Sequence, residues 1–238
     1  MVVEPRRFVS RGGLKLEAAI ETFGVEVEGR LCLDAGASTG GFSDCLLKRG
    51  AGRVFAVDVG HGQLAREIAT DPRVVAVEGC NIRNATLESL GAPAAFQVVV
   101  ADLSFISLRL VARKLSAELA SSGAQLIVLV KPQFEAGREV VNRGRGVIRD
   151  ASEWRDALLR VGTAFAAAGS AIIGVMASPI LGPAGNAEFF LHLHRLETPD
   201  PGAGEQGSSS VDQAIEAAAA LTSRSGTEPD PESDGPDL

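Results

Sequence analysis

A lysine stands at the carboxyl end of an apolar stretch in this sequence. In QLIVLVKPQFE, the apolar and largely branched run Leu126 to Val130 is followed by Lys131 and Pro132. A continuous apolar run is typical of a strand buried on both faces of a parallel sheet. Ligands bind outside the carboxyl ends of such strands. The position therefore favours a chemical role for Lys131 over that of a surface lysine whose stem covers apolar residues.

A glycine-rich turn follows another apolar run, in LDAGASTGGFSD. Its residues with a predicted role in ligand binding are Asp34, Gly36, Ser38, Thr39, Gly40, Gly41 and Phe42. The glycines allow the backbone to approach a ligand closely, and Ser38 or Thr39 can cap the helix that begins there. The spacing is not G-x-G-x-x-G, which argues against a dinucleotide.

Two polar residues end the next two apolar runs. Asp58 closes VFAVD, at the position where such folds hold ribose hydroxyls, and Asn81 follows VVAVEGC. The glycine turn, Asp58 and Asn81 together indicate a site for S-adenosylmethionine. A purely structural turn between strand and helix is the alternative.

Alternating apolar runs and helical patterns must position these residues. We expect helices at 14–24, 40–50, 62–71, 108–123 and 154–169, and strands at 31–36, 53–60, 74–81, 96–104, 125–132, 171–179 and 188–196. Strands separated by helices predict an α/β fold with a mostly parallel seven-stranded sheet and helices on both faces. Only a loop joins the last two strands, which predicts that the final strand is antiparallel and lies at or near an edge.

Composition divides the chain into parts. Of 238 residues, 45% are apolar, which is enough for a sizeable core. No run is long and apolar enough to span a membrane, and no signal peptide is evident, so we expect a cytoplasmic protein. After residue 197 the chain is acidic and rich in Pro, Gly and Ser. We therefore expect a basic arm and leading helix at 1–29, a catalytic domain at 30–197 and a largely disordered tail at 198–238.

Basic residues gather in two places outside the acidic tail. Candidates for contacts with the phosphates of a nucleic acid are Arg6, Arg7, Arg11, Arg138, Arg143 and Arg145. Ordinary solvated charge is the alternative for each cluster. The three cysteines have neither CxxC spacing nor a histidine partner, so we expect core residues and no metal site.

These motifs, taken in order, resemble one known family. FVSRGGLKLEAA, LDAGASTGGFSDCLL, AVDVGHGQL, VVADLSFISL, VKPQFEAGRE, GVIRD and SPILGPAGNAEFFLHL are similar to the TlyA-type branch of the FtsJ-like RNA methyltransferases. The resemblance covers about residues 7 to 194. It implies a Rossmann-like methyltransferase fold, S-adenosylmethionine as the cofactor without a metal, and rRNA or ribosomal subunits, rather than DNA or membranes, as the partner.

The resemblance also implies a catalytic tetrad. FtsJ-like enzymes methylate ribose 2′-hydroxyls with a Lys-Asp-Lys-Glu set, whose roles fall by local motif on Lys15, Asp102, Lys131 and Glu188. Asp102 is also expected to contact the cofactor. A hydroxyl is a poor nucleophile, so we expect burial and a neighbouring cation to lower the pKa of Lys131, which would then act as the base. Phe105 and Phe134, beside these motifs, could stack on a flipped base or lie in the core.

The start of the chain leaves the substrate open. TlyA-type proteins usually begin with a small RNA-binding domain, and MVVEPRRFVSRGG leads us to expect that this domain is missing here. The favoured function is methylation of cytidine ribose in 16S and 23S rRNA. A small-molecule O-methyltransferase is the first alternative, and a non-catalytic, hemolysin-like role is the second.

Overall fold

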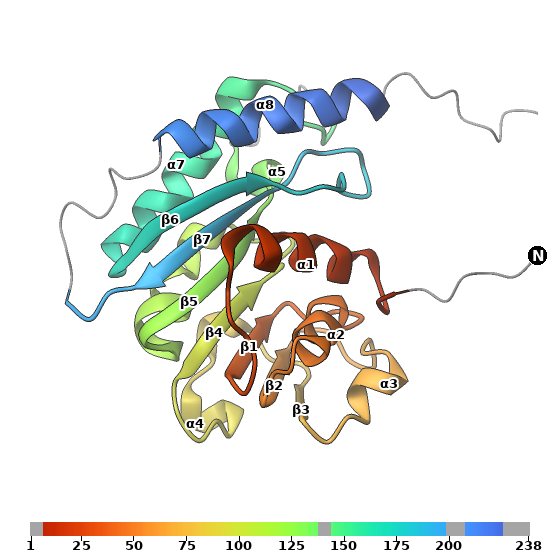
Figure 1. Cartoon of the computed structure of the whole chain (residues 1–238), viewed down its shortest axis with the longest axis vertical. Coiled ribbons are helices and arrows are strands. Elements are labelled where there is room, and N and C mark those ends of the chain that lie inside the picture. The colour runs from red at the N-terminus through yellow and green to blue at the C-terminus, as the bar shows by residue number, and fades with distance from the viewer. Residues whose placement is uncertain (1–6, 138–143, 199–207, 226–238) are drawn as a thin grey trace, which may run out of the picture.

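The computed structural model describes residues 7–137, 144–198 and 208–225. They form one seven-stranded sheet in the order β3-β2-β1-β4-β5-β7-β6 (Figure 1). Strands β1 to β5 run parallel, and β7 is antiparallel to both of its neighbours. The expected α/β fold with an antiparallel final strand is confirmed.

The strands are short and apolar, as expected of a sheet covered on both faces. They are β1 Leu31–Ala35, β2 Arg53–Val57, β3 Val74–Val77, β4 Phe96–Ala101, β5 Ala120–Val130, β6 Ser170–Ala177 and β7 Phe189–Arg195. The helices are α1 Arg11–Phe23, α2 Gly41–Lys48, α3 Arg66–Ala69, α4 Leu87–Leu90, α5 Pro132–Glu135, α7 Ala151–Ala167 and α8 Ser208–Ser225. Shorter turns are η1 Ile82–Asn84, η2 Leu108–Leu110 and the π-helical η3 Lys114–Leu119.

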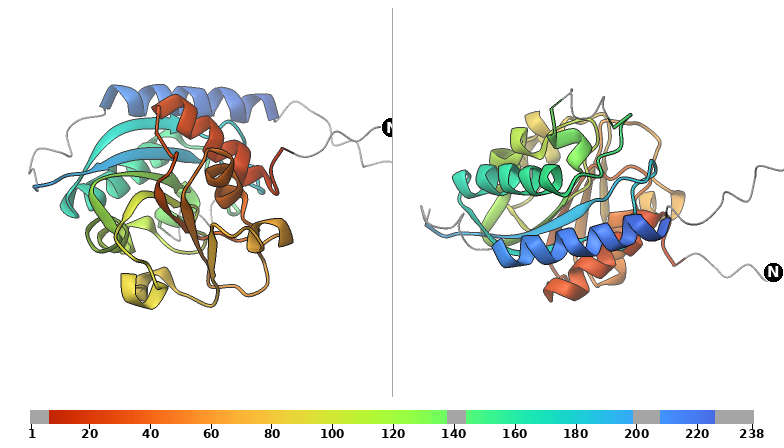
Figure 2. Two further views of the ribbon diagram at one scale, coloured as in Figure 1. Left: turned by 60° about the horizontal axis from the view of Figure 1, so that its bottom comes forward. Right: turned by 90° about the horizontal axis from the view of Figure 1, so that it is seen from above.

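Alternate residues of each strand point to two separate apolar layers. Leu16 and Ile20 of α1 pack with Ile127 and Phe190 on one face of the sheet. Trp154 and the rest of the apolar stripe of α7 pack in the layer on the other face. The right view of Figure 2 shows α1 and α7 on opposite sides of the strands. The sheet is thus buried on both faces, and ligands can reach its polar groups at the ends of the strands.

Three elements differ from the sequence prediction. The helix expected at 62–71 is the four-residue α3, and the helix expected at 108–123 is broken into η2 and η3. Strand β5 begins at Ala120, because Gly123 adopts a φ of 75° and the chain pairs with β4 through a register shift. Strand β7 lies next to the edge strand β6, which agrees with the predicted position at or near an edge.

The acidic segment contains a packed helix. We expected this part of the chain to lie outside the fold because of its composition, with at most a short and marginally stable helix at 211–223. Instead α8 packs against β6 and α7, and Arg155 of α7 forms an ion pair with Asp212. Its apolar residues join the larger core layer, namely Val211, Ala214, Ile215 and Ala218. Excluding this helix from the fold was therefore wrong, because tertiary packing supplies the stability that its length does not.

Truncating the packed face of α8 should destabilise the whole protein. Ile215 is 7% exposed, so Ile215→Ala should lower the free energy of unfolding by about 2 kcal/mol, through lost burial and the cavity that remains. Urea denaturation followed by the fluorescence of Trp154 measures this change. Glu216→Ala, on the exposed face of α8, is the control and should leave the unfolding midpoint near wild type. Equal midpoints for both variants would show that α8 does not pack as described.

Candidate active site

Two lysine–carboxylate pairs lie at the carboxyl edge of the sheet. Lys131 Nζ is 2.6 Å from Asp102 Oδ1, and Lys15 Nζ is 2.6 Å from Glu188 Oε2. The second pair is the more deeply buried, with side chains 8% and 1% exposed. Lys131 Nζ also donates to Ser104 Oγ at 2.9 Å. The four residues of the expected tetrad are thus brought together, although they are spread over 174 positions of the chain.

Three of the four residues stand at the end of a strand, and the fourth lies within a helix. Asp102 follows β4 and Glu188 precedes β7. Strand β5 ends at Val130, Lys131 is the N-cap of α5, and Pro132 occupies the first turn. Proline cannot continue the ladder because it has no N–H, so the chain turns away and Lys131 stays at the edge. Lys15 lies on the buried face of α1.

Two cavities meet at this edge. The smaller, of about 260 Å³, is lined by all four tetrad residues and by the amino end of α1. The larger, of about 540 Å³, lies toward β2 and β3. Four residues line both cavities: Gly36, Ser38, Asp102 and Ser104. Groups bound in the two cavities would therefore face each other across the Asp102 carboxylate.

The larger cavity is lined by both polar and apolar side chains. Asp58 follows β2 and Asn81 follows β3, and both line this cavity. Ile82, Leu103 and Ile106 supply apolar surface. Sequence reasoning missed these three residues because isolated apolar residues in loops carry no motif. Cys80 also lines the cavity, whereas Cys32 and Cys45 are buried as expected.

The glycine-rich turn is held by backbone contacts. Gly36 adopts a φ of 87°, and a Cβ there would lie 2.5 Å from the carbonyl oxygen of Asp102. Ser38 has a φ of 46°, and its N–H donates to Asp58 Oδ2 at 2.8 Å. Neither Ser38 nor Thr39 caps α2. The N-cap is Gly40, with a φ of 91°, so the capping prediction was wrong.

Of the other residues predicted to bind the cofactor, some line the smaller cavity and some line neither cavity. Thr39, Gly41 and Phe42 line the smaller one. Gly40 lines neither, because it packs against Leu64 and Ile68. Asp34 also lines neither cavity.

Asp34 is fully buried beneath the turn. It accepts a hydrogen bond from Ser43 Oγ at 2.7 Å. Burial raises the pKa of Asp34 to about 7, against the opposing effect of that hydrogen bond. Asp34 thus fixes the start of α2 from below the turn.

The basic candidates are only partly described. Arg6, Arg138 and Arg143 lie outside the described residues. Arg11 lines the tetrad cavity. Arg7 and Arg11 together line a neighbouring hollow with Phe8 and Leu14. Arg145 lies next to the segment that is not described, and lines none of these cavities.

Phe105 lies at the rim of the larger cavity and is not a core residue. It is 91% exposed, has a φ of 63°, and its ring centroid is 5.2 Å from that of Phe134. A large apolar side chain is rarely so exposed in a backbone conformation that L-residues disfavour. Of the two readings of Phe105, the core reading is therefore wrong.

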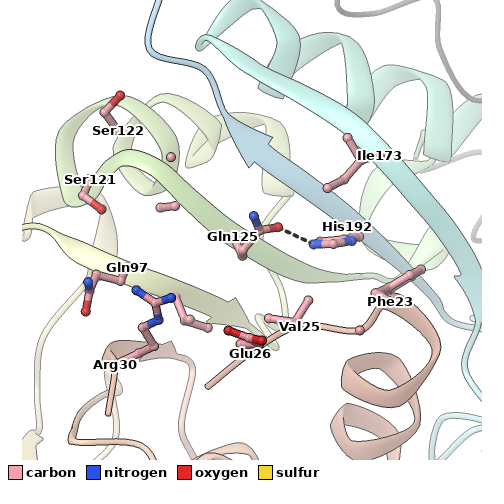
Figure 3. Close-up of a pocket in the computed structure, with 14 residues that line it drawn as sticks. Phe23, Val25, Glu26, Arg30, Gln97, Ser121, Ser122, Gln125, Ile173 and His192 are labelled. Atoms are coloured by element: carbon pink, nitrogen blue, oxygen red, sulfur yellow. Dashed lines mark hydrogen bonds between the residues drawn. The ribbon is translucent and has the colours of Figure 1, made fainter. Parts of the chain in front are cut away.

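Another hollow, of about 450 Å³, opens at the opposite edge of the sheet (Figure 3). Two of its polar side chains bond each other, and one of them also bonds His194 on the adjacent strand. His192 Nε2 donates to Gln125 Oε1 at 2.7 Å, and Gln125 Nε2 donates to His194 Nδ1 at 3.1 Å. The ring of Phe23 stacks on His192 with centroids 4.9 Å apart. Glu26 and Arg30 also line this hollow, and it shares no lining residue with the cavities of the tetrad and of Asp58.

Comparisons with known proteins agree with this geometry. The family model described as FtsJ-like methyltransferase matches residues 8–195. The 16S/23S rRNA (cytidine-2'-O)-methyltransferase TlyA of Mycobacterium tuberculosis is 50% identical over 188 residues, covering 79% of this chain and 69% of that protein. A solved structure from Lactococcus lactis, described as a candidate hemolysin, has a TM-score of 0.82 and 41% identity, covering 90% of this chain and 99% of that one. The magnesium protoporphyrin IX methyltransferase ChlM of Synechocystis PCC 6803, solved with bound SAH, shares the fold at 16% identity, with a TM-score of 0.53 and coverage of 78% and 82%.

The chain belongs to the FtsJ-like methyltransferase family, in the branch of TlyA and hemolysin A. The resemblance inferred from the motifs is confirmed, and with it the Rossmann-like methyltransferase fold and the dependence on S-adenosylmethionine. In the described ranges, no helix has the length and apolar character to cross a bilayer. Within the same residues, no group of three or more His, Cys, Asp or Glu side chains is arranged to hold a metal ion.

The buried histidine at the far edge should make stability depend on pH. Burial, and then the charge of His194, lower the pKa of His192 to about 4. An unfolded histidine binds its proton near pH 6.5, so below that pH the unfolded state binds more protons. The contribution of this residue is therefore present above pH 6.5 and should fall by about 3 kcal/mol between about pH 6.5 and 4. Urea unfolding across this range should show a smaller loss for His192→Gln than for wild type.

The control for this experiment is His61→Gln, because His61 is an exposed histidine at the other end of the sheet. It should keep the wild-type slope of stability against pH. If His192→Gln keeps the same slope as well, His192 is not the buried neutral group described here.

Proposed function

We propose that this protein methylates the ribose 2′-hydroxyl of cytidines in rRNA, with S-adenosylmethionine as the methyl donor. The observation that carries the proposal is the meeting of the two cavities at Asp102, with both lysine–carboxylate pairs lining the smaller one. TlyA of Mycobacterium tuberculosis acts on 16S and 23S rRNA, as its name states, and that of Campylobacter jejuni on 23S rRNA. An enzyme with this substrate works in the cytoplasm.

The larger cavity fits the cofactor. Its volume of about 540 Å³ lies in the range of small-ligand sites. The Asp58 carboxylate stands at the end of β2, where ribose hydroxyls are bound in folds of this type. Both of its oxygens accept backbone N–H groups, from Ser38 and Gly60, which fixes its orientation. When bound, the cofactor supplies a methyl group on a sulfonium sulfur, and the Asp102 end of the cavity is where that methyl would face the acceptor.

Lys131 is the proposed base. In its neutral form the Nζ atom can accept the proton of a 2′-hydroxyl while the ribose oxygen bonds to the methyl carbon and the carbon–sulfur bond breaks. Asp102, 2.6 Å away, then stabilises the ammonium group that forms. Ser104 restricts the same amine through its hydrogen bond of 2.9 Å. The rate then depends largely on holding oxygen, methyl and sulfur in line.

Lys15 and Glu188 are proposed to hold the ribose. Their ion pair ties α1 to the start of β7 and presents a donor and an acceptor to the smaller cavity. A Cβ on Gly182 would lie 2.6 Å from Glu188 Oε1, so the loop before β7 packs closely on this carboxylate. Two buried partners that restrain each other give the acceptor sugar a fixed set of contacts.

Contacts with RNA are proposed to come from exposed residues beside the two cavities. Arg7 and Arg11 offer cations next to the tetrad cavity, and the exposed ring of Phe105 offers a surface on which a base can stack. This assignment fits a basic arm and leading helix at 1–29, of which the described part packs on the catalytic domain and brings RNA to its tetrad. The boundaries at residues 29 and 197 remain part of the proposal, with α8 packed on the catalytic domain.

Loss of Lys131 should abolish methyl transfer while cofactor binding remains. Labelled S-adenosylmethionine is incubated with naked rRNA, separate subunits and intact ribosomes, and nuclease digests are analysed for 2′-O-methylcytidine. Lys131→Ala should reduce the product at least about 100-fold, because a positioned base contributes about 100- to 10,000-fold. Lys48→Ala removes an exposed lysine on α2 and should behave as wild type.

Each outcome of that assay has a defined meaning. Transfer to RNA lost only in Lys131→Ala supports the proposal and identifies the particle that is the substrate. Methylation of a small hydroxyl compound in the absence of RNA would show that the substrate is a small molecule and not rRNA. Equal transfer by Lys131→Ala and wild type would remove Lys131 from the chemistry.

Loss of Asp58 should weaken cofactor binding without affecting distant elements. Asp58→Ala removes the acceptor proposed for the ribose and releases the N–H groups of Ser38 and Gly60, so the Kd for S-adenosylmethionine should rise at least about tenfold. Isothermal titration calorimetry measures this change in the absence of RNA. Asp156→Ala, an exposed acid on α7, is the control. An unchanged Kd for Asp58→Ala would show that the larger cavity is not the cofactor site.

A further inference from the structure

One buried carboxylate of the QLIVLVKPQFE segment has no place in the tetrad. Glu135 ends the short helix α5 and is only 3% exposed. Its Oε2 accepts from Ser107 Oγ at 2.5 Å, and its Oε1 accepts from the N–H of Leu108 at 2.7 Å. Arg109 Nε lies 3.4 Å from Oε2. Since burying an unpaired carboxylate is unfavourable, these contacts fix Glu135 against the chain that follows β4.

That chain, residues 103–108, forms a wall of the larger cavity. Leu103, Ser104, Phe105 and Ile106 all line it. The same loop carries the Ser104 hydroxyl that meets Lys131 and the exposed ring of Phe105. The left-handed backbone at Phe105, with a φ of 63°, persists only where surrounding contacts hold it.

The helix α5 supplies those contacts at three points. Lys131 binds Ser104 at the start of the loop, Phe134 lies against Phe105 in its middle, and Glu135 binds Ser107 and Leu108 at its end. Of the three, Glu135 is the most deeply buried and makes the most hydrogen bonds to the loop. The segment after β5 therefore holds the whole segment after β4.

We propose that Glu135 is a positioning residue for methyl transfer: through Ser107 and Leu108 it fixes the 103–108 loop, and so places Ser104 beside Lys131 and closes one wall of the cofactor cavity. The carboxylate itself touches neither the tetrad nor the tetrad cavity. Its effect must reach the reaction through the loop. This inference rests on the proposed function for its catalytic consequence, but its effect on the cofactor cavity does not depend on the identity of the acceptor.

The test combines two substitutions of Glu135 with a matched control. Glu135→Ala removes all contacts to the loop, whereas Glu135→Gln keeps one oxygen that can accept from Leu108 N–H. Glu118→Ala, an exposed glutamate of η3 paired with Lys114, is the control. The full-length protein is assayed for cofactor Kd by calorimetry, for kcat and KM of both substrates, and for the urea midpoint.

We expect Glu135→Ala to raise the cofactor Kd about tenfold and to lower kcat about 100-fold, because misplacement by about 1 Å has effects of this size. Glu135→Gln should lie between Ala and wild type, and Glu118→Ala should match wild type. A loss of stability alone, with Kd and kcat unchanged, would overturn the proposal. If Glu135→Ala does not fold, the Gln variant gives the same comparison, and wild-type values for it would also overturn the proposal.

A double variant tests whether the effect passes through Ser104. If Glu135 acts by placing Ser104, adding Ser104→Ala to Glu135→Ala should slow transfer little beyond Glu135→Ala alone. If the two single effects multiply, Glu135 does not act through Ser104. Should no RNA accept a methyl group, the cofactor Kd of the single variants still tests the loop, so failure of the proposed function and failure of this inference are distinguishable.

Discussion

The ion pair between Lys131 and Asp102 depends on the neighbouring positions of two parallel strands. Strands β4 and β5 pair with Ala101 opposite Val128, so β5 extends two residues past the end of β4. The lysine at the end of the longer strand therefore lies beside the aspartate at the end of the shorter one. A change of register by one residue would send either side chain to the other face of the sheet. The buried apolar layers on both faces, which fix that register, thus also fix the chemistry at the edge.

The Lys15–Glu188 pair extends this constraint to the ends of the catalytic region. It joins the first described helix to the last strand of the sheet, and both side chains are almost fully buried. Breaking such a pair leaves an uncompensated charge and costs about 3–5 kcal/mol. The pair therefore fixes α1 over the site as well as presenting polar groups to the smaller cavity. Substitutions of Lys15 or Glu188 will combine lost stability with lost activity, which makes Lys131 the cleaner residue for testing the chemistry.

The chain after β4 and the chain after β5 act as one unit. Glu135 of α5 and Lys131, its N-cap, hold the loop that contains Ser104 and Phe105, and that loop lines the larger cavity. One short segment thus supplies both the proposed base and the support of the cavity wall. This arrangement explains why QLIVLVKPQFE carries a buried acid four residues after the lysine.

Sequence reasoning predicted the elements that follow from simple periodicity. Apolar runs, and glycines that end helices, predicted the strands and the class of sheet. They also predicted that Asp58, Asp102 and Lys131 lie at the carboxyl ends of strands. The prediction failed where tertiary contacts determine the local conformation. The packing of α8 depends on an apolar stripe meeting β6, and the early end of the helix predicted at 108–123 depends on the pairing of β5 with β4. At the left-handed Gly40, a Cβ would crowd Leu64 and Ile68. Ser104 and Glu135 were missed because their roles depend on hydrogen-bond partners that only the folded chain brings together.

The most direct test of the central claim, that Lys131 and Asp102 act as one unit on one proton, is a double-mutant cycle in single-turnover methyl transfer. Lys131→Met, Asp102→Asn and the double variant are compared with wild type at saturating cofactor. The account predicts that the double variant reacts about as fast as the slower single variant, because either substitution already disables the pair. Multiplicative losses in the double variant would show that the two residues act independently, and would contradict this account.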